Sequence, residues 1–383
     1  MDTDKMIRPE WIPEAYQEPE AVTDNKTKIG ETAKPLLSAF KNQQPRKIMF
    51  ESVKSPQIKM KELYELQDII SDAVNKLNFP EYPAQLYEPI SYILSLGGKR
   101  MRPALLLMAC DLFGGDIEAA IPPALAIEVF HNFTLMHDDI MDNAPIRRGH
   151  ATVHTKWNQN VGILSGDVML VQGYKLMMQV PDHLLRPILD IFNVTAIGVC
   201  EGQQLDMEFE ELTNVSIDEY LNMIKLKTAV VLGGALKIGA LIGGADTKDA
   251  DLLSDFGVNL GIAFQLQDDI LDVYGDPEKF GKQVGGDIIS NKKTYLLLKS
   301  LELSDEQQSA ELNKWLNAKQ FDYTDKVQAV TAIYDNLDVR QLAETAMQTY
   351  ADKAFAALDA INLPEEHKQY LRDFSDGLLV RES

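Results

Sequence analysis

From about Ser55 to the C-terminus, apolar residues recur at helical spacing, and strand-like alternation is nearly absent. Apolar residues at every third or fourth position predict helices with one buried face. Several segments are long and apolar on almost every side, and such helices lie at the centre of a bundle because no face suits water. The sequence therefore predicts an all-α protein, folded as a single large helical bundle. The clearest central segments are PPALAIEVFHNFTLMHDDIMD, DEYLNMIKLKTAVVLGGALKIGALI and DADLLSDFGVNLGIAFQLQDDILDVYG.

Residues 1–54 differ from the rest of the chain in composition and in hydrophobic patterning. They are polar, contain scattered prolines and show no lasting helical period, which is typical of a segment that cannot bury enough apolar surface to fold. We expect a flexible N-terminal extension over residues 1–54 and one domain over residues 55–383. The chain has 383 residues, of which 45% are hydrophobic, so a large core is possible.

Charge and cysteine content argue against several classes of protein. The chain has 37 Lys and Arg against 58 Asp and Glu, a net charge of −21, and such a surface repels nucleic acids and anionic membranes. Its two cysteines cannot build a disulfide framework and lack metal-site spacing. The apolar segments are interrupted by charge and are too short to span a bilayer, and the N-terminal segment resembles neither a signal nor a transit peptide. We expect a cytoplasmic protein with no nucleic-acid partner and no membrane insertion.

Two clusters of three aspartates each end an apolar run with the pattern Asp-Asp-x-x-Asp. They are Asp138, Asp139 and Asp142 in HDDIMD, and Asp268, Asp269 and Asp272 in QDDILD. On a helix, the first and third acids of each cluster share a face, whereas the middle acid is rotated by roughly 100° and flanks it. Two such faces across a cavity suit a hard cation such as Mg²⁺ rather than zinc. One cluster alone is more often a solvated helix end, but its recurrence predicts a metal site.

Basic residues lie beside both clusters, although the chain is strongly acidic. Mg²⁺ held by carboxylates commonly binds a substrate phosphate, and Arg and Lys take up the remaining phosphate charge. The candidates are Lys99, Arg100 and Arg102 in GGKRMRP, Arg147 and Arg148 in APIRRG, Lys227 and Thr228 in KLKTAV, and Lys282, Lys292 and Lys293 in FGKQVGGDIISNKKTY. His131 lies two helical turns before Asp138, near the same face. Each of these features has another reading when it is taken singly. GGKRMRP could be a basic surface turn, Lys227 could extend its charged end to solvent, and His131 could be a core residue. Together they predict a diphosphate-binding site.

In this order and at these separations, five segments resemble the motifs of the trans-isoprenyl diphosphate synthases, the polyprenyl synthetase family of farnesyl and geranylgeranyl diphosphate synthases. The segments are GGKRMRP, HNFTLMHDDIMDNAPIRRG, GQQLD, KTA and FQLQDDILDVYGDPEKFGK. The resemblance runs from about residue 58 to the C-terminus. It implies the all-α isoprenoid synthase fold around a central cavity, and a homodimer. It also implies prenyl transfer, in which isopentenyl diphosphate condenses with dimethylallyl, geranyl or farnesyl diphosphate after Mg²⁺-assisted ionisation to an allylic carbocation.

The resemblance also implies roles for individual residues. Asp138, Asp142 and Asp268 would bind three Mg²⁺ ions together with diphosphate, supported by Asp139, Asp269 and Asp272. The allylic diphosphate would be held by Arg147, Lys227 and Lys282, and isopentenyl diphosphate by Lys99, Arg102, His131 and Arg148. Thr228 and Gln265 would line the allylic site and help to stabilise the cation. Gln203 and Asp206 would face the same cavity, and Lys292 would lie near its mouth.

Product length is expected to depend on the residues just before the first cluster. Phe133 and Thr134 precede Asp138 by five and four residues, about one helical turn. In the family, a large aromatic residue here closes the floor of the cavity, which implies a short product, farnesyl or geranylgeranyl diphosphate. The alternative is that Phe133 is only a core residue. The C-terminus carries Arg381 as its one basic residue, where several relatives have a more basic tail, so we do not expect the tail to close the site.

Two other functions stay open at this point. A class I terpene cyclase would share the fold and one aspartate-rich cluster, but it has no need of the basic residues assigned to isopentenyl diphosphate. A non-catalytic subunit of a heteromeric prenyl synthase would only modify a partner enzyme, but such subunits tend to lose aspartates, and both clusters are intact here.

Overall fold

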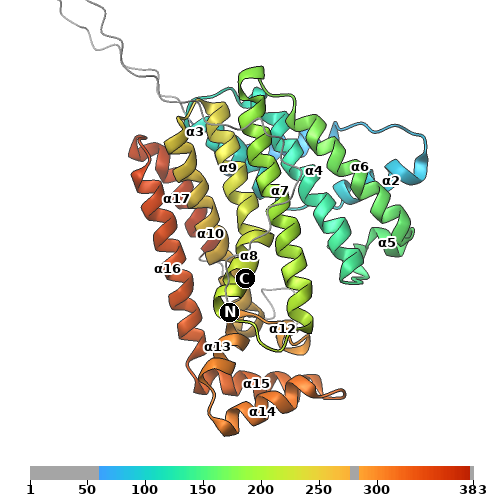
Figure 1. Ribbon diagram of the computed structural model, residues 1–383. Helices are drawn as coiled ribbons and strands as arrows, with labels where there is room; N and C mark the ends of the chain where they lie inside the picture. Colours follow the sequence, from blue (N-terminus) through green and yellow to red (C-terminus); the bar gives the residue numbers. More distant parts are fainter. Residues whose placement is uncertain (1–59, 277–283, 380–383) are drawn as a thin grey trace, which may run out of the picture. The chain divides into compact units, whose positions relative to one another are not determined.

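Helices make up almost all of the part of the chain that is described, residues 60–276 and 284–379 of a computed structural model (Figure 1). These residues belong to one unit, residues 58–383. The predicted extension over residues 1–54, Lys282 and Arg381 lie outside the described residues. The all-α prediction is confirmed, because the described part contains just one pair of two-residue strands, β1 (Ile146–Arg147) and β2 (His150–Ala151).

The helices of the first half of the chain are α1 (Leu63–Asn75), α2 (Ala84–Ser95), α3 (Met101–Leu112), α4 (Ile117–Met141), α5 (Val153–Lys156), α6 (Gln159–Met177) and α7 (Asp182–Glu211). Those of the second half are α8 (Ile217–Ile224), the π-helical turn η1 (Lys225–Ala229), α9 (Val230–Gly243), α10 (Thr247–Tyr274), α12 (Gly286–Ile289), α13 (Tyr295–Leu303), α14 (Glu306–Asn317), α15 (Tyr323–Asn336), α16 (Val339–Ala360) and α17 (Glu365–Leu379).

Helices α4, α9 and α10, which the sequence predicted to be central, each pack against several other helices. Helix α9 packs against α3, α7 and α10, helix α4 packs against α3 and α6, and α10 also packs along α16 (Figure 1). Every residue of α4 from Pro123 to Phe130 is buried. Because eight successive residues cover all sides of a helix, this stretch is surrounded by protein and needs the apolar sequence that it has.

The core consists of two hydrophobic clusters, and three segments pass from one to the other. Val199 of α7 and Val231 of α9 belong to the first cluster. Phe209 of α7 and Ala229 of η1 belong to the second. Helix α10 crosses likewise, since Leu260 is in the first cluster and the residues from Ile262 onward are in the second. The part of the chain that carries the predicted site therefore lies where the two clusters meet.

Candidate active site

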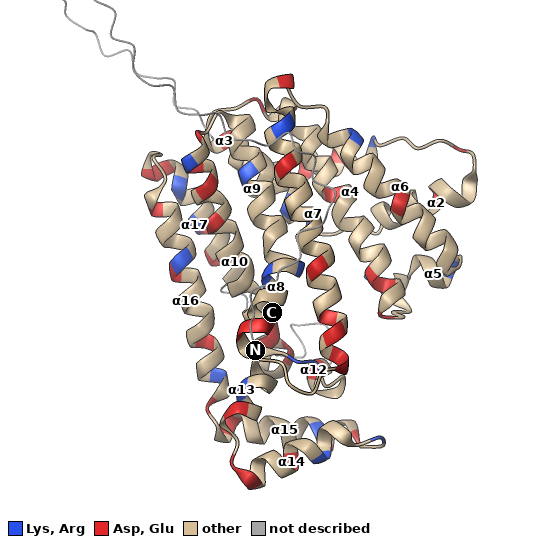
Figure 2. Ribbon diagram, viewed as in Figure 1, with Lys and Arg blue, Asp and Glu red and all other residues tan. Residues whose placement is uncertain are grey.

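Each aspartate cluster lies at the C-terminal end of a long helix. The first ends α4, where Asp142 is the last residue before the chain turns away, and the second lies in the last two turns of α10. Neither helix has a basic residue in its last turn, and Figure 2 shows the acidic residues at the lower end of α4. The C-terminus of a helix carries partial negative charge. Carboxylates placed there repel that charge, so both helix ends require cations from elsewhere.

The middle aspartate of each cluster is turned away from its partners. Asp139 and Asp269 are each 2% exposed, whereas the first and third aspartates of both clusters are at least partly accessible. Asp139 Oδ1 accepts a hydrogen bond of 2.8 Å from Arg147 Nε. Asp269 accepts hydrogen bonds from the Tyr220 hydroxyl and, at 3.4 Å, from the backbone N–H of Tyr295. This division follows from the helical rotation and leaves the first and third aspartates of each cluster at least partly accessible.

Two basic side chains supply the charge that the first cluster requires. Asp138 Oδ1 lies 3.4 Å from Lys227 Nζ, and Asp138 Oδ2 lies 3.4 Å from Arg147 Nη2. Lys227 Nζ also lies 2.5 Å from Asp206 Oδ2 of α7. Burial lowers the pKa of Lys227, but Asp206 and Asp138 outweigh this effect and bring the pKa above its usual value. Burial, with the nearby charge of Asp138, raises the pKa of the Asp142 carboxyl.

The π-helical turn η1 brings Lys227 and Thr228 into the site. The sequence predicted one continuous helix here, and the structure instead widens it for one turn between α8 and α9. Gly202 of α7 makes the approach possible, because a Cβ at this position would lie 2.2 Å from the backbone nitrogen of Lys227. Thr228 Oγ1 lies 3.5 Å from Gln265 Oε1, so η1 contacts α10 as well. Single π turns of this kind are frequent at functional sites.

The second cluster is tied to the loop that follows the undescribed residues 277–283. Asp272 Oδ2 accepts a 2.8 Å hydrogen bond from the backbone N–H of Asp287. Lys292 Nζ lies 3.8 Å from Asp287 Oδ1. Burial lowers the pKa of Lys292, and the carboxylates of Asp287 and Asp269 outweigh it and bring it above its usual value. Lys292 is therefore held among the acids of the second cluster.

The β1–β2 hairpin places its two arginines on different sides. Arg148 and Gly149 form its turn with positive φ of 51° and 76°, as a two-residue type I′ hairpin turn requires. Arg147 reaches back to the first aspartate cluster, whereas Arg148 Nη1 donates a hydrogen bond to the carbonyl of Gly97. Arg148 thus contacts the GGKRMRP connection.

Arg102 and His131 contact each other on the inner side of this connection. Arg102 Nη1 lies 3.3 Å from His131 Nε2. Burial, followed by the charges of Arg102 and Arg148, brings the pKa of His131 well below its usual value, so the imidazole is neutral. Lys99 is exposed, and its backbone carbonyl accepts a hydrogen bond of 2.5 Å from Gln67 Nε2.

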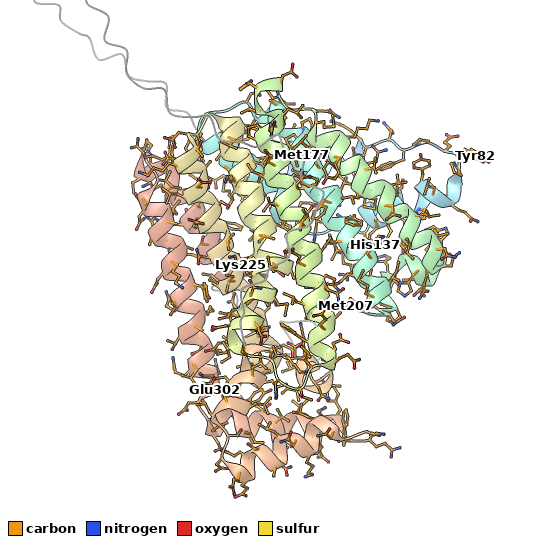
Figure 3. All side chains as sticks on the ribbon, in the orientation of Figure 1. Tyr82, His137, Met177, Met207, Lys225 and Glu302 are labelled. Carbon is orange, nitrogen blue, oxygen red and sulfur yellow. The ribbon has the colours of Figure 1, made fainter. Side chains whose placement is uncertain are left out.

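A cavity of about 260 Å³ is lined by part of these groups, including Asp138 of the first cluster, whereas the aspartates of the second cluster are not among its lining residues. Its lining includes eight of the residues predicted from the sequence, namely Arg102, His131, Phe133, Thr134, Asp138, Gln203, Lys227 and Thr228. Its other walls are mainly apolar and come from α4 and α7, on which His137 and Met207 are labelled in Figure 3. A larger hollow of about 850 Å³ lies between α10 and α16. Its lining contains none of the predicted residues, so the smaller cavity is the candidate site.

Two buried donors on the cavity wall have no hydrogen-bond partner within the described residues. They are Arg102 Nε and Gln203 Nε2. Buried polar groups of this kind are normally paired, so a polar ligand in the cavity is the natural partner of both.

Phe133 is one of the residues that line this cavity. It is 9% exposed, and its ring makes an edge contact with His137 and a tilted contact with Phe130, at centroid distances of 4.8 and 5.7 Å. Phe130 in turn contacts Phe192 at 5.4 Å. The aromatic rings form a wall one helical turn below Asp138.

The aspartates of the described residues do not form a ready-made metal cage. Within residues 60–276 and 284–379, no three His, Cys, Asp or Glu side chains are close enough to hold a metal ion by themselves. The donor set nevertheless fits Mg²⁺, which typically binds through one or two carboxylates, waters and substrate phosphates. Carboxylate oxygens at the negative ends of two helices provide that chemistry.

Sequence reasoning missed several residues that organise the site. Tyr220 and Asp287 hold the second cluster, and Glu128 and Asn132 form a buried group with Arg100, itself a sequence candidate, beneath the basic connection. Glu128 carries a detectable signal, since a lone acid in the apolar run AIEVF is unusual. Tyr220 has no comparable signal, because a tyrosine at an apolar helical position is ordinary.

Comparisons with known proteins agree on one family. A family model described as polyprenyl synthetase matches residues 83–334. A geranylgeranyl diphosphate synthase of Sulfolobus acidocaldarius is 38% identical over 317 residues, which cover 81% of this chain and 96% of that protein. A geranylfarnesyl diphosphate synthase of Natronomonas pharaonis is 32% identical over 344 residues, covering 83% and 96%. A crystal structure of a geranylgeranyl pyrophosphate synthase has 44% identity and a TM-score of 0.80, covering 85% of this chain and 100% of that one.

Proposed function

The chain belongs to the polyprenyl synthetase family of trans-isoprenyl diphosphate synthases and is a prenyltransferase, and we propose that it condenses isopentenyl diphosphate with an allylic diphosphate to give geranylgeranyl diphosphate. One observation carries the proposal. Side chains from α3, α4, α7 and η1 meet around a single cavity, whose lining combines the charged groups Arg102, Asp138 and Lys227 with the aromatic rings of Phe130 and Phe133. A diphosphate with an apolar tail combines the same two kinds of chemistry.

The charged end would bind and ionise the allylic substrate. Asp138, Asp142 and Asp268 would hold Mg²⁺, three ions with the diphosphate, and the ions would stabilise the departing diphosphate charge when bound. Arg147, Lys227 and Lys282 would grip the diphosphate itself, and Thr228 and Gln265 would line the path of the cation. Lys227 and Arg147 each lie 3.4 Å from Asp138. They would therefore be close to a diphosphate bound to Mg²⁺ at this aspartate.

Isopentenyl diphosphate would bind on the side of the cavity that carries Arg102 and His131. Lys99, Arg102 and Arg148 would hold its diphosphate, and neutral His131 would complete the contact. The apolar walls would exclude water, which would otherwise quench the allylic cation. No side-chain base is assigned, because the released diphosphate would accept the proton lost from the new double bond.

Phe133 supports a short product. Its ring stands one helical turn from Asp138 and is backed by Phe130, so a growing tail would meet an aromatic wall after few isoprene units. We propose twenty carbons because the more similar relatives are named geranylgeranyl diphosphate synthases. One relative is named a geranylfarnesyl diphosphate synthase. Product length therefore needs direct measurement.

We also propose a homodimer formed through α6 and α7. Leu164 and Val171 of α6 and Met178, the residue that follows it, recur every seven residues along one face and are each more than half exposed. Val194 and Ile197 of α7 are equally exposed. Apolar residues grouped on a helix face commonly mark a protein interface, and a two-fold axis would let each copy cover the other. Sedimentation velocity would measure the oligomeric state.

The proposed location is the cytoplasm, without membrane insertion. Cys110 and Cys200 are both free thiols, which fits a reducing compartment. The prediction that the apolar segments are too short to span a bilayer is wrong for two stretches, Asp182–Glu211 and Ile217–Gly243, which are long and apolar enough by length and composition. In the second stretch, α9 is almost wholly buried, from Val231 to Ala240 except for Lys237, so its apolar sequence is accounted for by the core of the bundle.

The function is tested by incubating the protein with Mg²⁺, isopentenyl diphosphate and labelled allylic primers. We expect elongated diphosphates, whose alcohols are separated by chromatography after dephosphorylation. Cyclic hydrocarbons would instead indicate a cyclase, and absence of turnover with every primer would indicate a non-catalytic subunit.

The same assay tests the first aspartate cluster. Asp138→Ala should lower kcat by a factor of at least about 100, as expected for loss of a group that stabilises developing charge, with little loss of folding. Glu118→Ala, an exposed acid at the other end of α4, is the matched control and should keep full activity. Full activity of the Asp138 variant would refute the metal assignment.

A further inference from the structure

Arg100 behaves differently from the two basic residues on either side of it. Lys99 is exposed and Arg102 lines the cavity, whereas Arg100 is 8% exposed and points into the core. Its Nη2 donates a 2.7 Å hydrogen bond to the carbonyl of Leu94. Its backbone has a φ of 49°, in the left-handed region that a residue with a Cβ disfavours. Contacts of the side chain must therefore hold this residue in place.

The main contact is a buried ion pair with Glu128 of α4. Arg100 Nη1 donates to Glu128 Oε1, and both side chains are almost fully buried. Asn132, one turn further along α4, donates a second hydrogen bond of 2.7 Å to the same oxygen. Glu128 is thus fixed from two sides, and it links α4 to the connection between α2 and α3.

Glu128 is also a countercharge for the cations that face the cavity. Its charge acts on both Arg102 and Arg148 and favours their charged forms against burial and against their mutual repulsion. Arg148 lies directly against the connection, because a Cβ at Gly98 would be 2.9 Å from its Nη2. Like charges gathered at this density repel one another, and a buried carboxylate beneath them offsets that repulsion.

We propose that Glu128 is a positioning residue for the isopentenyl diphosphate site, rather than a part of the core alone. By anchoring Arg100, it fixes the connection from which Lys99 and Arg102 project and against which Arg148 rests. This inference rests on the proposed function, since it takes those three side chains as the grip on isopentenyl diphosphate. Glu128 does not itself line the cavity and is not expected to touch substrate.

Glu128→Gln tests the inference by removing one charge at almost constant shape. The amide oxygen still accepts from Asn132, but Arg100 loses its countercharge. We expect the KM for isopentenyl diphosphate to rise about tenfold, the lower end of what loss of an outer partner costs at organised binding sites. The KM for the allylic diphosphate should stay close to that of the parent. Glu128→Asp, which keeps the charge, should restore part of the loss.

Asp111→Asn is the matched control. Asp111 is a buried carboxylate on α3, the helix that carries Arg102, and it accepts a 2.8 Å hydrogen bond from the backbone N–H of Lys61. This substitution should lower the thermal midpoint without changing either KM. An unchanged KM for isopentenyl diphosphate in a folded Glu128→Gln protein would overturn the inference, as would an equal rise in the KM of both substrates.

A second variant covers the case in which Glu128→Gln does not fold. Arg100→Met combined with Glu128→Leu replaces the ion pair by apolar side chains, an exchange that proteins often tolerate. It should show the same selective rise in KM, and a parental KM would overturn the inference.

Calorimetric titration with isopentenyl diphosphate measures binding directly and needs no turnover. Binding weakened by Glu128→Gln supports the inference, whereas a parent protein that binds isopentenyl diphosphate but elongates no primer would refute the proposed function alone.

Discussion

Phe133→Ala should lengthen the product if, as we propose, the ring of Phe133 occupies the place into which the next isoprene unit would extend. The ring is 9% exposed, lines the cavity and stands between His137 and Phe130. Truncation to alanine removes the whole phenyl group and leaves Phe130, which is 1% exposed, as the next wall.

The structure limits the expected change to about one isoprene unit. Removing one large apolar side chain leaves a cavity of about 150 Å³ that accepts benzene, and an isoprene unit has fewer carbons than benzene. Burying five more carbons is favourable by about 4 kcal/mol, at about 0.8 kcal/mol for each group. The main product should therefore change from twenty to about twenty-five carbons. The cost in folding free energy should be about 3 kcal/mol, the lower end for a buried phenylalanine, because Phe133 borders an existing cavity.

The assay is elongation of labelled isopentenyl diphosphate, followed by dephosphorylation and chromatography of the prenyl alcohols. Phe209→Ala serves as the control, since Phe209 is also buried on the neighbouring cluster but does not line the cavity. It should lower the thermal midpoint and leave the product unchanged. A parental product profile from Phe133→Ala would refute the reasoning, and so would equal lengthening by Phe209→Ala, because destabilisation alone would then be the cause.

Two further substitutions test how the site is held. Gly202→Ala should displace η1, because the new Cβ would lie 2.2 Å from the backbone nitrogen of Lys227; we expect about 1–3 kcal/mol of destabilisation and a clear loss of kcat. Gly198→Ala, whose Cβ would meet its nearest neighbour at 3.5 Å, should be tolerated, and equal effects of the two would contradict this account. Burial raises the pKa of Asp269 to about 7, so the folded chain holds a proton that the unfolded chain releases above about pH 4. Without added metal, stability should therefore fall as pH rises from about 4 to about 7, and Asp269→Asn should flatten that decline in urea unfolding; identical pH profiles would refute the assignment.

The cations around the first aspartate cluster suggest how the site tolerates its own charge. Lys227 and Arg147 lie where they partly neutralise Asp138, and Lys292 does the same for the acids near Asp287. Lone like charges at helix C-termini would be unfavourable. Cations from other parts of the chain offset this repulsion, and in the proposed function they are also the groups that hold diphosphate.

Local patterns in the sequence were enough to predict the all-α class and which helices are central. Helical periodicity is local, so the all-α fold and the central positions of α4, α9 and α10 followed from apolar spacing alone. The rotation of about 100° per residue likewise separated Asp139 and Asp269 from their neighbours, and both are buried. Eight of the residues suggested by the family motifs line the cavity; their roles stay predictions.

Which site residues contact one another depends on how the helices pack. The π turn of η1 depends on the close approach of α7 at Gly202, and that contact joins segments far apart in the chain. The same holds for Arg100. The sequence groups it with Lys99 and Arg102, yet a left-handed backbone and a carboxylate on another helix turn it into the core. A local pattern fixes the direction in which a side chain leaves its own helix, but the partner that it reaches is fixed by how the helices pack.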